Sequence, residues 1–296
     1  MSTLKGGLAI LFITINTIAC CIPIYLLALP RAVLRNEPWR VAVAAGMTRI
    51  IDVWVAGNRF LMRAIDMTHI ETSVNTSAPL SRGRWYVVIS NHQGWSDILV
   101  LQDVFLRRIP PLKFFVKRQL LWVPFIGFAM WLLEFPYVHR YSREALEKNP
   151  ELRRHDQEAT KQACEHFKRR PTSVLNFMEG TRFTMEKHAR QNSKFHNLLT
   201  PKTGGFGYVV GALGQRIDQV LDVTIVYPGG VPSFWEFLSG QSPTVRVEIS
   251  TRQVPAPLVE ADDELAADVR EELRVWVDDL WLQKDRRIDE LREARR

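Results

Sequence analysis

Short β-rich runs alternate with helical patterns from residue 84 to residue 250, and this alternation limits the possible fold more than any other feature of the chain. The candidate strands cover residues 85–90, 113–117, 135–138, 173–177, 220–227 and 244–250. Helical periodicity lies between most of them, notably at residues 96–106, 155–169 and 204–214. Strands that alternate with helices predict an α/β fold with a largely parallel sheet flanked by helices. Ligands of such sheets bind beyond the carboxyl ends of the strands.

The N-terminal segment has no charged side chain between residues 6 and 30. As a helix, residues 8–29 would be about 33 Å long, enough to cross a hydrocarbon core of about 30 Å. A cleaved signal peptide is the main alternative, but its apolar region normally covers only about 7–15 residues. The segment therefore predicts a retained membrane helix.

The charges beside this helix predict its orientation. They are Lys5 on one side and Arg31, Arg35 and Arg40 on the other. By the positive-inside rule, the rest of the chain lies on the cytoplasmic side of a membrane, which would be the inner membrane in a bacterium. Asn16 and Pro23 leave a second arrangement open, in which the helix breaks and lies in the interface.

Two further segments have apolar surfaces that suit a membrane. Residues 39–65 form an amphipathic helical pattern with a basic polar face, which fits either a membrane surface or packing against the domain. Residues 118–133 are strongly apolar and fit either a core helix or a surface that enters lipid. The predicted segments are a membrane-anchor helix at 1–35, an interfacial helix at 36–70, a catalytic domain at 71–255 and a charged helix at 256–296.

The 296 residues carry a formal net charge of +7, which suits an anionic partner. Nucleic acid is disfavoured because the basic residues are scattered and the sequence has no zinc-finger or RNA-binding signature. The three cysteines form no C-x-x-C pair, so they predict neither a disulfide framework nor a structural zinc site. No histidine pair has the spacing of a helical metal site. An anionic membrane surface or acidic substrates are the partners that fit.

A polar turn, SNHQGWSD, directly follows the predicted strand 85–90. Asp97 would begin the next helix, so its carboxylate can fold back onto the ring of His92. A carboxylate on one imidazole nitrogen fixes the tautomer and leaves the other nitrogen free as a general base. The alternative is that Asp97 caps its helix and His92 only fills the turn.

The sequence offers no good candidate for a protein nucleophile. Ser96 lies in GWSDI, where Ile98 occupies the second glycine position of a nucleophile elbow. Cys164 lies in a charged helical pattern, away from any predicted turn. A base without a nucleophile indicates that His92 activates a hydroxyl group of a substrate.

A second cluster, NFMEGTRF, begins in the predicted strand 173–177 and continues past its end. Gly180 permits a tight turn whose backbone N–H can approach a ligand. The guanidinium of Arg182 offers a planar fork that matches phosphate. A strand-end turn with a solvent-exposed arginine is the simpler alternative. Further candidates for a phosphate group are Lys117, Arg140 and Lys202, each near a predicted strand end or a glycine turn.

Taken in order, these motifs resemble those of the glycerolipid acyltransferase family, whose members acylate lysophosphatidic acid and related lysolipids. The matches are N-H-x-x-x-x-D at Asn91, His92 and Asp97, an aromatic-aliphatic-x-Arg run at Tyr137, Val138 and Arg140, F-x-E-G-T-R at Phe177, Glu179, Gly180, Thr181 and Arg182, and an aliphatic strand from Val223 to Pro228. The resemblance covers roughly residues 80–230. Departures occur at Met178, Glu134 and Thr224, and they bear on the identity of the acceptor more than on the type of reaction.

The resemblance implies transfer of a fatty acyl group from acyl-coenzyme A or acyl carrier protein to a lysophospholipid at a membrane. The acceptor would be 1-acylglycerol-3-phosphate and the product phosphatidic acid, with no cofactor besides the acyl donor. His92 would be the general base, oriented by Asp97, and backbone N–H groups of the SNHQG turn would hold the oxyanion. The implied substrate-binding residues are Arg182, Lys117, Arg140, Lys202, Glu179, Gly180 and Thr181. Among them Arg182 would hold the acceptor's phosphate, and Glu179 would orient Arg182 or contact a hydroxyl.

Two other functions stay open on the sequence alone. A membrane-tethered hydrolase would use the same His92–Asp97 pair to activate water, and it would release free fatty acid without an acceptor. A non-catalytic membrane adaptor would bind anionic lipid through its basic face, with or without His92.

Overall fold

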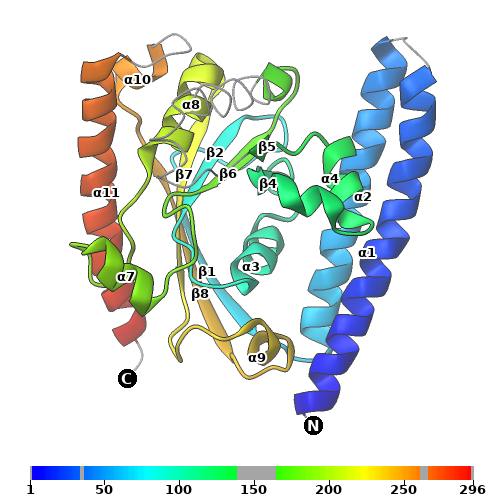
Figure 1. Ribbon diagram of the computed structural model, residues 1–296, viewed down its shortest axis with the longest axis horizontal. Helices are drawn as coiled ribbons and strands as arrows, with labels where there is room; N and C mark the ends of the chain where they lie inside the picture. The colour runs from blue at the N-terminus through cyan, green and yellow to red at the C-terminus, as the bar shows by residue number, and fades with distance from the viewer. Residues whose placement is uncertain (1, 34–36, 139–164, 261–265, 295–296) are drawn as a thin grey trace.

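The computed structural model describes residues 2–33, 37–138, 165–260 and 266–294. Within them, six strands form the main sheet in the order β1-β8-β7-β2-β6-β3 (Figure 1). Their bounds are β1 His69–Asn75, β2 Tyr86–Ser90, β3 Leu112–Phe114, β6 Ser173–Phe177, β7 Gln219–Val226 and β8 Thr244–Arg252. β2 is parallel to β6 and β7, β3 to β6, and β1 to β8, whereas β7 and β8 are antiparallel. The predicted α/β fold with a largely parallel sheet is confirmed.

The sheet differs from the strand predictions in detail. β1 has the sequence HIETSVN, and its mostly exposed side chains at the sheet edge explain why no apolar run marks it. The predicted run 113–117 is divided between two sheets, because β4 (Val116–Lys117) leaves the main sheet and pairs with β5 (Tyr137–Val138). Most of the predicted helix 155–169 lies outside the described residues.

Helices cover both faces of the main sheet, and the alternation of side chains along β2 divides the core in two. Tyr86 and Val88 pack with α3 (Ser96–Phe105) and α9 (Phe234–Leu238). Val87 and Ile89 pack on the other face with α8 (Thr203–Leu213) and α11 (Ala267–Glu293). The shorter helices are η1 Arg118–Trp122, α4 Ile126–Leu132, α7 Met185–Gln191, η2 Gly214–Arg216 and α10 Ala256–Glu260. Figure 1 shows α3 and α11 on opposite sides of the sheet.

A buried ion pair attaches α11 to the sheet. Lys284 of α11 pairs with Asp222 of β7, and its ammonium also donates to the carbonyl of Val223 at 2.7 Å and to the hydroxyl of Thr224 at 3.0 Å. Burial lowers the pKa of Lys284, and Asp222 opposes that effect. Because removing Asp222 would leave the buried ammonium of Lys284 without its carboxylate partner, the pair fixes α11 against the strand whose end reaches the candidate site.

Two long N-terminal helices, α1 (Ser2–Val33) and α2 (Glu37–Ala64), pack as an antiparallel pair along one side of the molecule (Figure 1). α1 continues through Asn16 and Pro23 without a break. The side-chain nitrogen of Asn16 donates to the carbonyl of Trp54 and to Oδ1 of Asn58, each at 2.9 Å. The polar residue that could have interrupted α1 therefore bonds it to α2.

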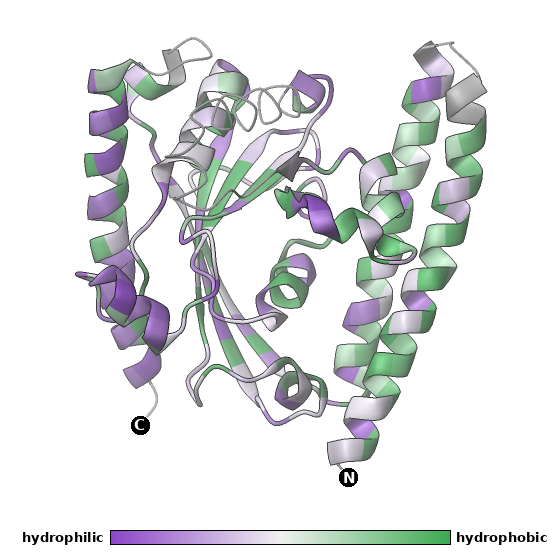
Figure 2. Ribbon diagram, viewed as in Figure 1, coloured by the Kyte–Doolittle hydropathy of each residue, from purple (hydrophilic) through white to green (hydrophobic). Residues whose placement is uncertain are grey.

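In the part of the chain that the structure describes, α1 is the helix long and apolar enough to cross a bilayer, and only 17% of its apolar stretch is buried. Large apolar side chains are exposed on both helices of the pair. They include Leu4, Leu8, Leu11, Ile15, Ile22, Leu26, Leu29, Val41, Val53 and Phe60. Figure 2 shows hydrophobic residues along both ribbons, a surface that suits lipid better than water.

Candidate active site

The two predicted motifs meet at the carboxyl edge of the sheet. His92 follows β2, and Glu179 follows the neighbouring parallel strand β6. Asn91 fixes the His92 turn to β7, because its side-chain amide donates to the carbonyl of Ile225 and accepts from its N–H, both at 2.9 Å. The N–H of Phe183 donates to the carbonyl of His92 at 2.8 Å, which joins the loop after β6 to the same turn.

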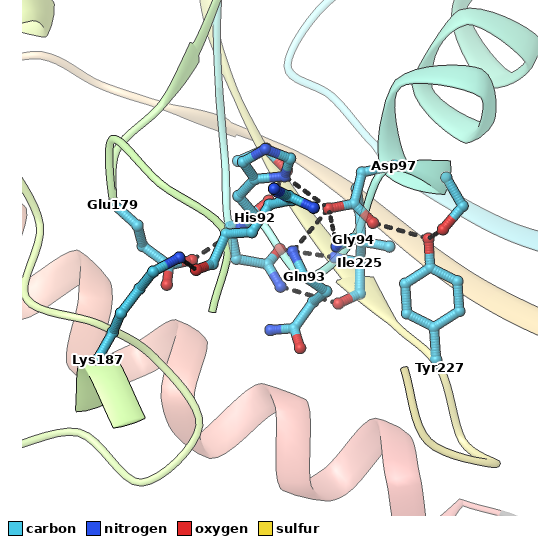
Figure 3. A network of polar contacts seen from close by, with 12 residues as sticks. His92, Gln93, Gly94, Asp97, Glu179, Lys187, Ile225 and Tyr227 are labelled. Atoms are coloured by element: carbon cyan, nitrogen blue, oxygen red, sulfur yellow. Dashed lines mark hydrogen bonds and ion pairs between the residues drawn. The ribbon is translucent and has the colours of Figure 1, made fainter. Parts of the chain in front are cut away.

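The side chains of His92 and Asp97 are hydrogen-bonded, with 2.9 Å between Nδ1 and Oδ2 (Figure 3). Asp97 is fully buried, whereas 15% of the His92 side chain is exposed. An ionised carboxylate can only accept, so this contact places a hydrogen on Nδ1 and leaves Nε2 with a lone pair. The imidazole is stacked on Phe177, with 3.9 Å between the ring centroids. The pair has the tautomer and the fixed orientation that a general base needs.

Asp97 accepts hydrogen bonds on both of its oxygens. Besides the imidazole, Oδ2 accepts the backbone N–H groups of Gln93 at 2.6 Å and Gly94 at 2.9 Å. Oδ1 accepts the hydroxyl of Tyr227, 2.7 Å away, and that hydroxyl lies 2.8 Å from Oγ of Ser96. Burial and the adjacent Asp97 raise the pKa of Tyr227 well above its ordinary value, so the hydroxyl keeps its proton and donates.

The backbone N–H groups of this turn do not form the oxyanion hole that the sequence suggests. Those of Gln93 and Gly94 donate to Asp97, and that of His92 donates to Oε1 of Glu179 at 2.8 Å. A donor already bound to a carboxylate is not free for a developing oxyanion. That expectation is wrong for these three groups, which instead build the turn around Asp97.

Glu179 is buried, and both of its oxygens accept from the backbone. Oε1 accepts the N–H of His92 at 2.8 Å, and Oε2 accepts that of Leu199 at 3.0 Å. Burial raises the pKa of this carboxyl to about 8, while the two backbone hydrogen bonds act in the opposite direction. Glu179 therefore ties the His92 turn to the segment before α8. A direct contact between Glu179 and substrate stays a prediction.

Arg182 lies on an aromatic residue of the His92 turn, with its guanidinium carbon 4.3 Å from the ring centroid of Trp95. The ammonium of Lys187 donates to the hydroxyl of Thr181 at 2.9 Å and to the carbonyl of Arg182 at 2.8 Å. Burial and the nearby charges of Arg182 and Arg190 lower the pKa of Lys187. A stacked guanidinium and a hydroxyl on the loop after β6, together with an ammonium from the first turn of α7, are suited to a phosphate group.

The other predicted binding residues differ in their placement. Gly180 has a φ of 65°, in the left-handed region that favours glycine. Lys202 packs beside it, because a Cβ at Gly180 would lie 3.1 Å from Cδ and 3.5 Å from Nζ of Lys202. Lys117 is exposed on β4, outside the main sheet. Arg140 lies outside the described residues. Of the three additional cations proposed from the sequence, the structure places Lys202 at the loop that carries Arg182.

Sequence reasoning missed Tyr227, Trp95 and Lys187. Tyr227 had a usable signal, because it ends the predicted strand 220–227 and side chains at the carboxyl ends of parallel strands converge. Trp95 and Lys187 had none. The contact of Trp95 with Arg182 depends on how two loops fold against each other, and the contacts of Lys187 with Thr181 and Arg182 depend on the turn that precedes α7.

Comparisons with known proteins indicate the family of this chain. The sequence profile of the family described as Acyltransferase matches residues 38–228. Lysocardiolipin acyltransferase 1 of Mus musculus is 26% identical over 256 residues, which cover 81% of this chain and 62% of that protein. The probable 1-acyl-sn-glycerol-3-phosphate acyltransferase 5 of Arabidopsis thaliana is 29% identical over 214 residues, which cover 68% of this chain and 53% of that protein. The chain thus spans between half and two thirds of the length of these relatives.

A solved structure shares the fold. The crystal structure of the 1-acyl-sn-glycerophosphate (LPA) acyltransferase PlsC from Thermotoga maritima matches 95% of this chain and 98% of its own chain, with a TM-score of 0.53 at 18% identity. Because 95% of the chain is covered, the likeness includes the α1–α2 pair as well as the sheet.

Proposed function

We propose that this chain, which belongs to the acyltransferase family, transfers a fatty acyl group from a thioester to the free hydroxyl of a lysophospholipid. The observation that carries the proposal is the His92–Asp97 pair, bonded at 2.9 Å, with Arg182 stacked on the same turn. A base beside a phosphate-binding cation suits an acceptor that has both a hydroxyl and a phosphate. The names of the lysocardiolipin and 1-acyl-sn-glycerol-3-phosphate acyltransferases support this class of acceptor.

In the proposed reaction, Nε2 of His92 takes the proton of the acceptor hydroxyl while the hydroxyl oxygen attacks the thioester carbonyl carbon. The new C–O bond forms, and the carbonyl π electrons move onto oxygen. When the tetrahedral intermediate collapses, the C–S bond breaks, and the sulfur leaves with the bonding electrons and receives the proton from the imidazolium. Asp97 keeps the hydrogen on Nδ1 and stabilises the imidazolium between the two steps.

The acyl group passes directly from donor to acceptor in this scheme. Ser96, the serine of the same turn as His92, is buried, and its hydroxyl is bonded to Tyr227. The acceptor's own hydroxyl is therefore the nucleophile. The donor is acyl-coenzyme A or acyl carrier protein, because either supplies a thioester whose thiolate is a good leaving group.

For the acceptor we favour 1-acylglycerol-3-phosphate, which would give phosphatidic acid. Its phosphate would contact the guanidinium of Arg182, with Lys202 beside Gly180 as a second cation. Lysocardiolipin is the competing acceptor, and it differs in presenting phosphodiesters instead of a phosphomonoester.

An apolar cavity of about 260 Å³, bounded by the α1–α2 pair, α3 and α4, would receive an acyl chain. Ile98, which follows Asp97 in α3, lines this cavity and connects it to the helix that carries Asp97. Other lining residues include Cys21, Val55, Phe105, Ile126 and Met130. The exposed apolar side chains of α1 and α2 would hold the cavity at a lipid surface, with the catalytic domain on the cytoplasmic side.

The proposal is tested with the purified full chain, a panel of lysolipids, both classes of donor, and mass spectrometry of the products. Conversion of 1-acylglycerol-3-phosphate to phosphatidic acid that disappears in His92→Ala supports it. Release of free fatty acid independent of any acceptor would indicate a hydrolase. Lipid binding without turnover, unchanged by the loss of His92, would indicate an adaptor.

A further inference from the structure

A second basic site lies at the amino edge of the sheet, opposite the dyad. It is a cavity of about 590 Å³, bounded by the first half of α2, the end of α4 and the segments that lead into β2, β3 and β6. The five residues of β2 separate it from the His92 turn by about 17 Å. Its charged lining residues in the described chain are Arg40, Arg49, Arg82, Lys113, Arg169, Arg170 and Glu134. Cations therefore dominate this cavity.

These cations are only partly neutralised. Arg82 pairs with Asp52 at 2.6 Å, and Arg170 pairs with Glu134 at 2.9 Å. Within the described chain, Arg49 and Arg169 have no acidic partner and are exposed. One comes from α2 and the other from the turn before β6, so they border the cavity from two elements. Two uncompensated guanidinium groups around a hollow favour a ligand with phosphate oxygens.

The cavity adjoins an apolar surface of α2, which indicates where such a phosphate would come from. Val41 lines the cavity and is 62% exposed, and the nearby Trp39 is 41% exposed. A membrane phospholipid would lay its acyl chains on these side chains while its phosphate entered the cavity. A soluble phosphate ester would use the arginines but would gain nothing from Val41 and Trp39.

We propose that this cavity binds the phosphate head group of an anionic membrane phospholipid, at a site separate from that of the reacting acceptor. Occupation of the cavity would hold the first half of α2 in the membrane interface. It would also make the attachment of the enzyme to a membrane depend on the content of anionic lipid.

The test measures binding of the full chain to vesicles of phosphatidylcholine, with and without phosphatidylglycerol, by flotation. The variant is Arg49→Gln/Arg169→Gln. Each charge near an anionic surface contributes roughly fivefold to binding, so we expect about 30-fold weaker partition onto the anionic vesicles. On pure phosphatidylcholine the variant should match the wild type, because the apolar contacts are unchanged.

The matched control is Arg270→Gln/Arg286→Gln, which removes the same charge from exposed positions of α11, on the opposite side of the molecule (Figure 1). This control should bind anionic vesicles like the wild type, because charges beyond a Debye length of about 8 Å are screened. An equal loss in both double variants would show that only net charge matters, and it would overturn the proposal.

A third variant distinguishes binding in the cavity from general electrostatic attraction to the vesicle surface. Ala45 lines the cavity and is exposed, so Ala45→Phe should fill part of the hollow without altering charge or core packing. We expect it to reduce the preference for phosphatidylglycerol. An unchanged preference would overturn a specific site.

A soluble probe separates the two sources of phosphate. If Arg49→Gln/Arg169→Gln weakens binding of adenosine 3′,5′-bisphosphate but leaves vesicle binding intact, the cavity takes a soluble phosphate and the lipid assignment is wrong. Binding is measured without turnover, so these results do not depend on the reaction proposed above.

Discussion

The two edges of the sheet differ in how their ionisable side chains are buried and paired. At the carboxyl edge, Asp97 and Glu179 are buried, and every one of their carboxyl oxygens accepts a hydrogen bond from the protein. At the amino edge, Arg49 and Arg169 are exposed around a cavity and have no acidic partner among the described residues. The carboxyl groups of the first edge are paired within the protein, whereas the two guanidinium groups of the second edge are available to a ligand.

The difference indicates what each edge can do. A buried carboxylate bonded on both oxygens holds its neighbours in one geometry, which a proton transfer requires. Exposed guanidinium groups keep their rotamer freedom, so they suit a ligand whose position varies, such as a lipid head group in a fluid membrane. Substitutions at the carboxyl edge should therefore change rate constants, and those at the amino edge should change partition onto membranes.

His92 should show the largest effect of any substitution at the carboxyl edge. We expect His92→Ala to lower kcat about 10²–10⁴-fold, the usual contribution of general base catalysis, with the fold unchanged by circular dichroism. His196→Ala is the control, because that side chain is 78% exposed, and its activity should match the wild type. A His92→Ala protein that kept more than about a tenth of the activity would remove the base from the mechanism.

Arg182 should show the next largest effect, confined to one substrate. An ammonium cannot reproduce the planar fork of a guanidinium, so Arg182→Lys should raise the KM for a phosphate-bearing acceptor roughly 10- to 150-fold. The KM for the thioester donor should be unchanged. Arg190→Lys, at a nearby exposed position of α7, is the matched control. Steady-state kinetics with each substrate varied in turn decide the matter, and a weakened donor with an unchanged acceptor would move Arg182 to the donor side.

The sequence predicts the carboxyl edge far better than the amino edge, for a physical reason. His92 and Asp97 are five positions apart, and the loop with Arg182 follows an adjacent parallel strand, so local pattern and sheet topology are enough to bring them together. The cavity at the amino edge instead combines α2 and the end of α4 with three separate segments that precede strands. Which of the scattered arginines of a basic chain gather there depends on tertiary packing.

The hydrogen-bond partners of individual polar groups are a second feature that the sequence does not predict. The turn around His92 was predictable, but the direction of its N–H groups was not, because a carboxylate distant in sequence, Glu179, takes one of them. Arg140 lies outside the described residues, so its proposed role in phosphate binding stays a prediction. Spacing therefore identifies which residues meet, whereas the partner of each polar atom depends on the packed structure.

The raised pKa of Glu179 can be tested through the pH dependence of the unfolding free energy. Its pKa is raised to about 8 in the folded protein, against about 4.3 for an exposed glutamate in an unfolded chain. Between these values the unfolded state loses its proton first, so the stability of the native state should fall as pH rises, by up to about 1.4 kcal/mol per pH unit. Urea unfolding from pH 5 to 8 should show this slope in the wild type and a shallower one in Glu179→Gln, which has no proton to lose. Parallel slopes would show that Glu179 does not titrate in this range.

The smallest expected effect concerns Tyr227, whose hydroxyl donates to Asp97 at 2.7 Å. Tyr227→Phe leaves Oδ1 buried without that donor, which should cost about 1.5 kcal/mol of unfolding free energy and slow kcat about tenfold, because the carboxylate that orients His92 is less firmly held. Tyr137→Phe is the control, since its hydroxyl donates at 2.7 Å to the neutral carbonyl of Gly127. The control should lose about 1 kcal/mol and keep its kcat. Urea unfolding and steady-state kinetics on both variants separate a general loss of stability from a specific effect on Asp97. If the two substitutions lower kcat equally, Tyr227 contributes to the packing of the sheet and not to the position of the dyad.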